Sequence, residues 1–220
     1  MYFYFKRFFD FLFSLIAILL LSPVLIIITI LLKFSKEKDA FYLQKRIGFK
    51  NKSFNILKFA TMLRDSPNIG TGSITLRKDP RVTKIGKFLR MSKINELPQL
   101  FNILLGDMSI VGPRPLMGTS FIKYTEEVKS KIYNVKPGLT GIGSLIFRDE
   151  EKLVSESGIP PEEFYAKYIF PYKGQLESWY LENISFFTDI KIIFITAWSI
   201  IVPLNNLSKV FFRNLPSRKF

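Results

Sequence analysis

The sequence contains no cysteine and no histidine, and these two absences narrow its chemistry. Without cysteine there is no disulfide scaffold, no thiol nucleophile and no thiolate metal site. Without histidine there is no Ser-His-Asp triad, no imidazole general base and no histidine-bound zinc. Any chemistry must therefore use carboxylates, amides, hydroxyls, lysine or arginine. A bound metal is expected to be a hard cation held by oxygens, and Mg²⁺ fits that description best.

Acidic residues are also few. The chain has 32 Lys and Arg against 18 Asp and Glu, which gives a net charge of +14. Such a balance is typical of proteins that bind an anionic partner: nucleic acid, acidic lipid or a phosphorylated substrate. Hydrophobic residues make up 48% of the 220 residues. This is enough to bury a core, so disorder and low-complexity structure are excluded, and the length favours one compact domain, two at most.

Residues 12–32 carry no charge, and this stretch is long enough to cross a bilayer. Ser22 and Pro23 lie near its middle, and proline kinks or breaks a helix. The Ser22 hydroxyl is well placed to satisfy a carbonyl group that the proline frees. Basic residues flank both ends of the stretch, so the positive-inside rule places both ends in the cytoplasm. From the residues alone, a re-entrant hairpin broken at this pair and a single spanning helix remain equal alternatives.

Four other segments have readable patterns. Residues 54–59 alternate weakly, which predicts a short strand, and residues 66–73 are rich in turn formers, which predicts a loop. Residues 160–180 are expected to be helix-rich and aromatic. The apolar run 192–204 is too short to span a membrane, so it predicts a core or interfacial helix. Asp10 is expected to be an interfacial residue close to two basic neighbours.

Two helices are expected in the middle of the chain. One begins near Thr83, and the other begins near Ser92 and continues to Gly106, a plausible C-terminal stop. Pro98 fits only the first turn of this second helix. This arrangement places Asn95 and Glu96 at or beside a helix N-terminus, where unpaired N–H groups and the helix dipole favour anions. Glu96 is therefore the best candidate carboxylate, with an ordinary capping-region acid as the alternative.

Arg114 is the best single candidate for a binding residue, because Pro113 and Pro115 flank it and predict a rigid extended turn. A guanidinium held by rigid backbone suits bidentate phosphate recognition, although an arginine that caps a helix C-terminus is the structural alternative. Residues 135–141 predict a second turn of this kind. Asp107 is expected to be structural, bonding the turn that follows a helix.

Several motifs follow one another in an order that is specific to one family. The most informative is Asn-Glu-Leu-Pro-Gln-Leu-Phe-Asn at residues 95–102. The others are at residues 6–10, 22–23, 44–48, 58–62, 79–90, 106–109, 111–115, 136–141 and 189–191. Together they resemble the bacterial sugar transferases, the monotopic phosphoglycosyl transferases, over nearly the whole chain.

This resemblance implies an α+β, helix-rich fold. It implies a monotopic membrane protein with a re-entrant helix–break–helix over residues 1–38 and a small cytoplasmic catalytic domain with interfacial helices over residues 39–220. It thereby favours the hairpin over the straight span. The implied activity is transfer of a phosphosugar from a nucleotide diphosphate sugar to polyprenyl phosphate, at the cytoplasmic face of the bacterial inner membrane. Such a step initiates a surface glycan.

The resemblance also assigns roles and exposes a departure. In the family an Asp-Glu pair precedes Leu-Pro-Gln-Leu; the aspartate is the nucleophile and the glutamate helps to bind Mg²⁺. Glu96 matches, but Asn95 stands in the place of the aspartate, and a neutral amide cannot form an acyl phosphate. Ala60 replaces a basic residue of a second motif. The segment 143–147 is altered as well, although Arg148 stays in register.

The resulting predicted site is defined by role. Asn95 and Glu96 are the catalytic pair, and Glu96 is the Mg²⁺ ligand. The residues expected to bind substrate phosphate are Lys58, Arg81, Arg90, Arg114 and Arg148. Asp107, Pro113 and Pro115 are expected to support the site, and Ser22 and Pro23 to break the membrane helix. The expected partners are a nucleotide diphosphate sugar, polyprenyl phosphate, an anionic phospholipid membrane and a second copy of the chain in a homodimer.

Three explanations of Asn95 stay open. The chain belongs to a divergent branch that uses direct attack by the lipid phosphate or another nucleophile; or it is a site-directed variant that traps substrate; or it is a non-catalytic relative that binds the lipid or a partner enzyme. A function of another class, a membrane-anchored nucleic-acid-binding protein, would interleave basic residues with exposed aromatics. Here the phenylalanines lie mostly in apolar runs, so nucleic acid is not an expected partner.

Overall fold

The computed structural model describes residues 2–69, 74–76, 79–201, 211–212, 214–218 and 220, and this part of the chain is rich in helix. Its helices are α1 (Tyr2–Lys33), α2 (Lys84–Met91), α3 (Gln99–Leu105), α4 (Gly118–Phe121), α5 (Glu126–Ile132), α6 (Ile142–Ile146), α7 (Glu150–Glu156), α8 (Pro161–Phe164), α9 (Phe170–Glu182) and α10 (Phe186–Ile201). Its strands are β1 (Phe41–Ile47), β2 (Ser53–Phe59), β3 (Ser109–Val111) and β4 (Gly138–Thr140). Short 3₁₀ turns are η1 (Phe49–Asn51), η2 (Ser66–Asn68) and η3 (Ile94–Glu96), and η4 (Tyr165–Ile169) is a π-helical turn. The α+β, helix-rich prediction is confirmed at this level.

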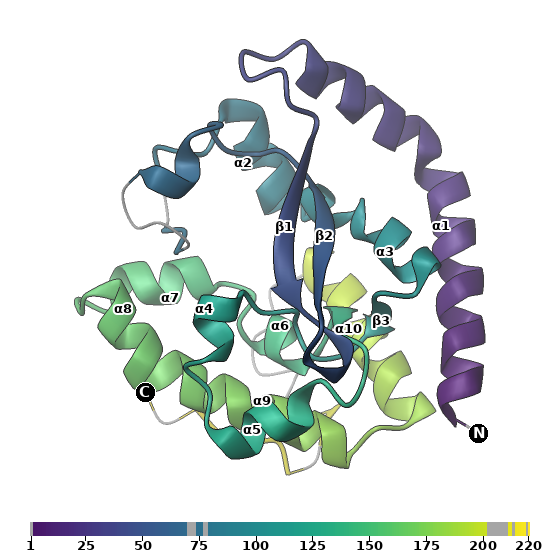
Figure 1. The fold of residues 1–220 in the computed structure, drawn as a ribbon, viewed down its shortest axis with the longest axis vertical. Coiled ribbons are helices and arrows are strands. Elements are labelled where there is room, and N and C mark those ends of the chain that lie inside the picture. The colour runs from purple at the N-terminus through teal and green to yellow at the C-terminus, as the bar shows by residue number, and fades with distance from the viewer. Residues whose placement is uncertain (1, 70–73, 77–78, 202–210, 213, 219) are drawn as a thin grey trace.

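The first element, α1, is the one described helix that is long and apolar enough to cross a membrane. It continues through Pro23, so the expected interruption at this residue is not seen in the secondary structure. Figure 1 shows α1 running up one side of the molecule and then leaning over its top. The Ser22 hydroxyl donates to the Leu19 carbonyl at 2.8 Å. That carbonyl is the one Pro23 leaves without an N–H partner, so the hydrogen bond predicted for the Ser22 hydroxyl is confirmed, whereas the helix break predicted at Ser22 and Pro23 is not seen.

The N-terminal half of α1 is fixed to two elements that lie far along the chain. The Arg7 guanidinium donates to the carbonyls of Ile103 and Leu104 at 2.6 and 2.8 Å, which satisfies the open end of α3. The Asp10 carboxylate accepts the backbone N–H of Ile110 in β3 at 2.9 Å. Asp10 is only 5% exposed, so its expected interfacial position is wrong. It fails because the acid satisfies a strand-end N–H group instead of facing lipid headgroups.

The C-terminal half of α1 packs on a β-hairpin and on α2. Strands β1 and β2 pair antiparallel from Phe41 opposite Phe59 to Ile47 opposite Ser53, which confirms the strand predicted at residues 54–59. Leu32 of α1 is buried against Phe59 and against Leu89 of α2. Both halves of α1 therefore contact the same folded unit.

The helix expected near Thr83 is present as α2. The Thr83 hydroxyl accepts the N–H of Gly86 at 3.0 Å, a regular N-cap contact. In the region predicted as a loop, Ser66–Asn68 forms the turn η2, and residues 70–73 lie outside the described residues. A Cβ on Gly86 would lie 2.0 Å from the Thr61 carbonyl oxygen, so only glycine lets α2 approach the end of the hairpin this closely.

The helix expected over residues 92–106 begins later than predicted. Lys93 has φ of 61°, a left-handed conformation that interrupts the chain after α2, and the turn η3 follows. The helix α3 starts only at Gln99, directly after Pro98, and ends at Gly106 as predicted. Asn95 and Glu96 therefore precede the helix as a separate turn.

The segment that carries Arg114 follows a two-stranded parallel sheet. Ser109 of β3 pairs with Gly138 of β4. A Cβ on Gly138 would lie 2.1 Å from the Gly112 nitrogen, so glycine is required where the two segments cross. The Gly138 N–H donates to the Pro113 carbonyl at 2.9 Å. The predicted rigid, non-helical segment is confirmed, and the second turn at residues 135–141 is the element that holds it.

The C-terminal helices enclose the main hydrophobic core. Residues 160–180 are helical, as predicted, through α8, η4 and α9. The run predicted at 192–204 belongs to a longer helix, α10, and its residues beyond 201 lie outside the described ones. Leu176 of α9 and Ile192 of α10 are completely buried against Ile142 of α6. This core supports the part of the fold that carries the polar site described below.

Candidate active site

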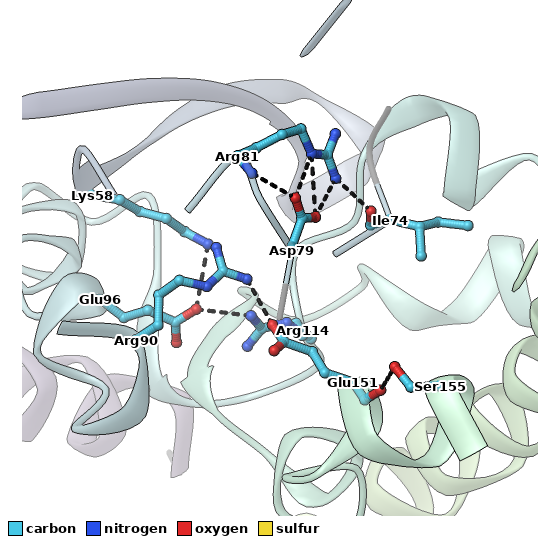
Figure 2. A network of polar contacts seen from close by, with 9 residues as sticks. All are labelled: Lys58, Ile74, Asp79, Arg81, Arg90, Glu96, Arg114, Glu151 and Ser155. Atoms are coloured by element: carbon cyan, nitrogen blue, oxygen red, sulfur yellow. Dashed lines mark hydrogen bonds and ion pairs between the residues drawn. The ribbon is translucent and has the colours of Figure 1, made fainter. Parts of the chain in front are cut away.

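Glu96 lies at the centre of a charged cluster that collects residues from three separate parts of the fold. Its Oε1 atom accepts from Arg114 Nη2 at 2.8 Å and from Lys58 Nζ at 3.3 Å. Figure 2 shows the two cations approaching the carboxylate from β2 and from the segment after β3. The Glu96 side chain is 17% exposed and that of Arg114 is 38% exposed. The structure thus brings together three of the predicted site residues.

The electrostatics of the cluster keep all three side chains charged at neutral pH. Burial opposes ionisation of Glu96, but Arg114 and Lys58 outweigh it and hold the pKa of this carboxyl well below its usual range. Glu96 in turn raises the pKa of the Arg114 guanidinium. Burial lowers the pKa of the Lys58 ammonium to about 8, despite the attraction of Glu96. The site therefore presents two cations beside one carboxylate, a charge pattern suited to phosphate groups.

Arg114 is held on both sides of its backbone. The Tyr133 hydroxyl donates to the Arg114 carbonyl at 2.8 Å and accepts the Leu116 N–H at 2.9 Å. Behind the turn, Glu177 Oε1 accepts the Arg114 N–H at 3.5 Å. Arg46 donates to the Pro115 carbonyl at 3.2 Å, and the Arg114 Nη1 atom reaches the Ser144 hydroxyl at 3.4 Å. Pro113 and Pro115 are thus parts of a braced turn, and the guanidinium is preorganised.

Asn95, the other predicted catalytic residue, is 8% exposed in η3 and lines the same cavity. Among the described residues its Oδ1 atom is buried without a hydrogen-bond partner. The described residues contain no group of three or more acids that could enclose a metal. Mg²⁺ is usually bound through one or two carboxylates together with substrate phosphates. Glu96 and the unpartnered Asn95 oxygen fit that donor set, with phosphate oxygens completing it.

The site opens into a cavity of about 1870 Å³. Two more predicted phosphate-binding residues line it. Arg90 of α2 forms an ion pair with Glu151 at 2.7 Å, which is drawn in Figure 2. Arg148 carries a buried Nη1 atom that has no hydrogen-bond partner among the described residues. Arg148 therefore has an unsatisfied donor at the cavity wall.

Two predicted residues do not belong to this cluster. Arg81 is 3% exposed and binds Asp79 at 2.7 Å, and it also donates to the carbonyls of Ser66, Ile69 and Ile74. Figure 2 shows no contact between this network and Glu96. Its guanidinium organises the loop before α2 and is not presented to the cavity. Asp107 is exposed, and its backbone N–H group donates to the Asn102 carbonyl at 2.9 Å; the bond expected from its side chain to this turn stays a prediction.

Sequence reasoning missed Glu177. This side chain is 3% exposed, and burial raises the pKa of its carboxyl to about 7. A Cβ on Gly143 would lie 2.4 Å from Glu177 Oε1, so the altered segment after residue 141 leaves room for the carboxyl through a glycine. The only local signal is an acid beside Leu176 on the buried face of a helix. Nothing in the local sequence places it behind Arg114.

The lowered pKa of Lys58 predicts how the cluster binds anions as the pH changes. Sulfate stays a dianion throughout, so its binding reports on the protein. We expect its affinity to fall about tenfold between pH 7 and 9.5, the loss of one charge-assisted contact, because Lys58 loses its proton above pH 8. Isothermal titration calorimetry would measure this. Lys58→Arg stays charged and should flatten the decline; an equally steep decline in that variant would contradict the assignment.

Comparison with known proteins gives consistent matches. Residues 1–203 match the sequence model of a family described as bacterial sugar transferase. The chain is 38% identical over 157 residues to the undecaprenyl-phosphate glucose phosphotransferase of Komagataeibacter xylinus, covering 66% of this chain and 30% of that protein. It is 32% identical over 207 residues to the UDP-N-acetylgalactosamine-undecaprenyl-phosphate N-acetylgalactosaminephosphotransferase of Aeromonas hydrophila, covering 91% and 44%.

A third relative is closer in length. The chain is 33% identical over 205 residues to the exopolysaccharide production protein ExoY of Rhizobium meliloti strain 1021, covering 87% of this chain and 83% of that protein. The chain thus spans less than half the length of the first two relatives and most of the third.

Proposed function

Because the chain belongs to the bacterial sugar transferase family, we propose that it transfers a phosphosugar from a nucleotide diphosphate sugar to polyprenyl phosphate and so initiates a surface glycan. The names of two relatives state that they act on undecaprenyl phosphate, and the name of a third refers to exopolysaccharide production. The observation that carries the proposal is the Glu96–Arg114–Lys58 cluster, which lines a cavity in a domain packed against an apolar helix.

In this proposal the cations bind the diphosphate of the donor. Arg114 offers a braced guanidinium that can contact two phosphate oxygens, and Lys58 offers a compact charge beside it. Glu96 holds both cations in place before the donor arrives, so little rearrangement is needed on binding. When bound at Glu96 and Asn95, Mg²⁺ would neutralise charge on the diphosphate.

Asn95 favours a direct displacement over a covalent route. In the direct reaction, a phosphate oxygen of the polyprenyl phosphate forms a bond to the sugar-bearing phosphorus of the donor. The bond from that phosphorus to the bridging oxygen breaks, and the nucleoside monophosphate leaves with the electron pair. Arg114 and Lys58 stabilise the charge that develops on the leaving phosphate. No step of this scheme requires residue 95 to supply an electron pair.

The proposed location is the cytoplasmic face of the bacterial inner membrane, with residues 1–38 as a re-entrant membrane segment and residues 39–220 as the cytoplasmic domain. Basic residues at both ends of α1 support this topology. The packing of α1 supports it too, because Arg7 near one end and Leu32 near the other both contact the same domain. A helix attached along its length to a charged domain cannot carry its far end across a bilayer.

The topology predicts that both ends of α1 are shielded from the periplasm. The natural chain lacks cysteine, so Tyr4→Cys and Phe34→Cys each create a single label site. The two positions are matched, being 85% and 88% exposed. In intact cells a membrane-impermeant maleimide should label neither variant, and after permeabilisation it should label both. Labelling of position 4 alone in intact cells would establish a spanning helix.

The activity itself is tested by product release. Purified protein in phosphatidylglycerol-containing vesicles is incubated with undecaprenyl phosphate, Mg²⁺ and a panel of UDP-sugars, and released UMP is measured. We expect acceptor-dependent release with one or a few donors. No release with any donor, together with retained binding of undecaprenyl phosphate, would instead favour a non-catalytic relative that holds the lipid.

A further inference from the structure

A second, smaller cavity lies between α1 and α10 and has a volume of about 250 Å³. On α1 its wall is a row of aromatic side chains spaced four residues apart, which places them on one helix face. The apolar α10 residues that line the cavity are spaced three or four positions apart, so they also lie on one helix face. The apolar lining residues include Phe5, Phe9 and Phe13 from α1, Phe186, Ile190 and Ile193 from α10, and Ile110 and Val111 from β3. The rings of Phe9 and Phe186 lie 6.2 Å apart, centroid to centroid, and join the two walls.

The polar groups at this groove are already bonded to one another. Asp189 accepts from the Tyr2 hydroxyl at 2.6 Å and from the Tyr180 hydroxyl at 2.8 Å, and it forms an ion pair with Lys6. Asp10 is bonded to the backbone of β3. These contacts clamp α1 to α9 and α10, and they consume the charges that a polar ligand would need. The groove therefore suits an apolar ligand.

The groove and the catalytic cavity share two wall residues. Ile110 and Ile193 line both of them. Ile110 belongs to β3, which leads directly into the Arg114 turn, and Ile193 is one turn along α10 from Ile190. The apolar groove therefore adjoins the cavity that Arg114 lines, and it opens beside the exposed apolar surface of α1, where Phe5 is 57% exposed and Phe13 is 46% exposed.

We propose that this groove binds the isoprenoid chain of the polyprenyl phosphate acceptor, next to its phosphate, and delivers that phosphate past Ile110 and Ile193 to Arg114. This inference rests on the proposed function. An apolar cavity of about 150 Å³ holds a six-carbon ring, so 250 Å³ accommodates about two five-carbon isoprene units. A single chain fits a groove of this size, and the remaining units extend along α1 into the bilayer. A phospholipid would have to place two chains there.

Photocrosslinking tests the occupant directly. A benzoylphenylalanine is placed at position 5, which lines the groove, or at position 8, which does not; the natural residues are both Phe and are 57% and 59% exposed. The full chain is reconstituted in phosphatidylglycerol vesicles that contain a small fraction of radiolabelled undecaprenyl phosphate. We expect the position 5 probe to capture at least fivefold more undecaprenyl phosphate than the position 8 probe, with equal capture of phosphatidylglycerol. Equal capture of undecaprenyl phosphate at the two positions would overturn the proposal.

Kinetics provide an independent test with a matched pair on α10. Ile190→Trp fills the groove, whereas Phe194→Trp adds bulk at an exposed position outside it. We expect Ile190→Trp to raise the KM for undecaprenyl phosphate at least tenfold and to leave the KM for the donor unchanged, and Phe194→Trp to change neither. Equal acceptor KM values in both variants would place the chain elsewhere.

Failure of the groove proposal and failure of the proposed function would give different results. Turnover by the natural chain without selective capture at position 5 would refute the groove and leave the proposed function intact. Selective capture of undecaprenyl phosphate without turnover would support the groove and refute the transferase reaction. Preferential capture of phosphatidylglycerol at position 5, in the presence of undecaprenyl phosphate, would identify the groove as a structural lipid site and overturn the proposal.

Discussion

Replacing Glu96 with Gln should lower kcat/KM for phosphosugar transfer by roughly 10²–10³-fold, the usual loss when one preorganised electrostatic group is removed from an active site. Glutamine keeps the size of the side chain and loses its charge. Arg114 and Lys58 then repel each other without the carboxylate between them, and the carboxylate that we propose as a Mg²⁺ ligand is lost. The measurement is acceptor-dependent UMP release over a donor concentration series.

The control for this variant is the neighbouring ion pair. Glu151→Gln removes the partner of Arg90, an acid whose side chain is 47% exposed, and should change kcat/KM by less than about threefold. Arg114→Ala removes the guanidinium that pairs with Glu96 and should weaken donor binding by about tenfold to a hundredfold. Both changes in the main cluster should leave the melting transition cooperative. Native activity in Glu96→Gln would show that the reaction takes place elsewhere.

Replacing Asn95 with Asp should create a covalent phosphosugar adduct that the natural chain does not form. A carboxylate oxygen at this position can bond to the donor phosphorus while the nucleoside monophosphate leaves, which an amide cannot do. We expect only a minor fraction of the protein to react, because Ala60 and the segment around Phe147 differ from the family pattern as well. Intact-protein mass spectrometry with donor and Mg²⁺, and no acceptor, would detect the adduct.

The matched control is Asn95→Ala, which removes the amide and supplies no nucleophile. An adduct on the natural chain, or on Asn95→Ala, would mean that another residue is the nucleophile and that the direct displacement is wrong. Turnover that appears only in Asn95→Asp would mean that the asparagine disables an otherwise covalent enzyme. Turnover in the natural chain without any adduct is the result that the direct displacement predicts.

The family and the local elements could be predicted because their signals are local. The motif order identified the family correctly, and the Thr83 cap, the strand that carries Lys58, the Gly106 stop and the non-helical turn between Pro113 and Pro115 are each specified by neighbouring residues. Glu96 and Arg114 were predicted as site residues, and they form an ion pair at 2.8 Å that lines the cavity.

Three of the failures concern polar groups, because the sequence alone does not show which partner satisfies each of them. Asp10 reads as interfacial because its partner, the Ile110 N–H, is a hundred residues away. Arg81 resembles a phosphate ligand, but the carbonyls of its own loop and Asp79 use its donors. Glu177 has no local signal for its place behind Arg114. The helix start at residue 92 failed because Lys93 adopts a left-handed conformation, which sequence rules assign mainly to glycine and asparagine.

Because α1 is attached to the domain at two places, the length of the helix fixes the distance between the elements that it contacts. Arg7 and Asp10 fasten one part of it to α3 and β3, the two elements that flank the Asn95–Glu96 turn and the Arg114 turn, and Leu32 fastens the other part to the hairpin that carries Lys58. The distance between Asp10 and Leu32 is fixed by the helix, at roughly 1.5 Å for each residue. One residue inserted between them would rotate one attachment by about 100° relative to the other. The spacing of the three charged groups therefore depends on the length of this apolar helix, so a change in the length of α1 would also alter the candidate site.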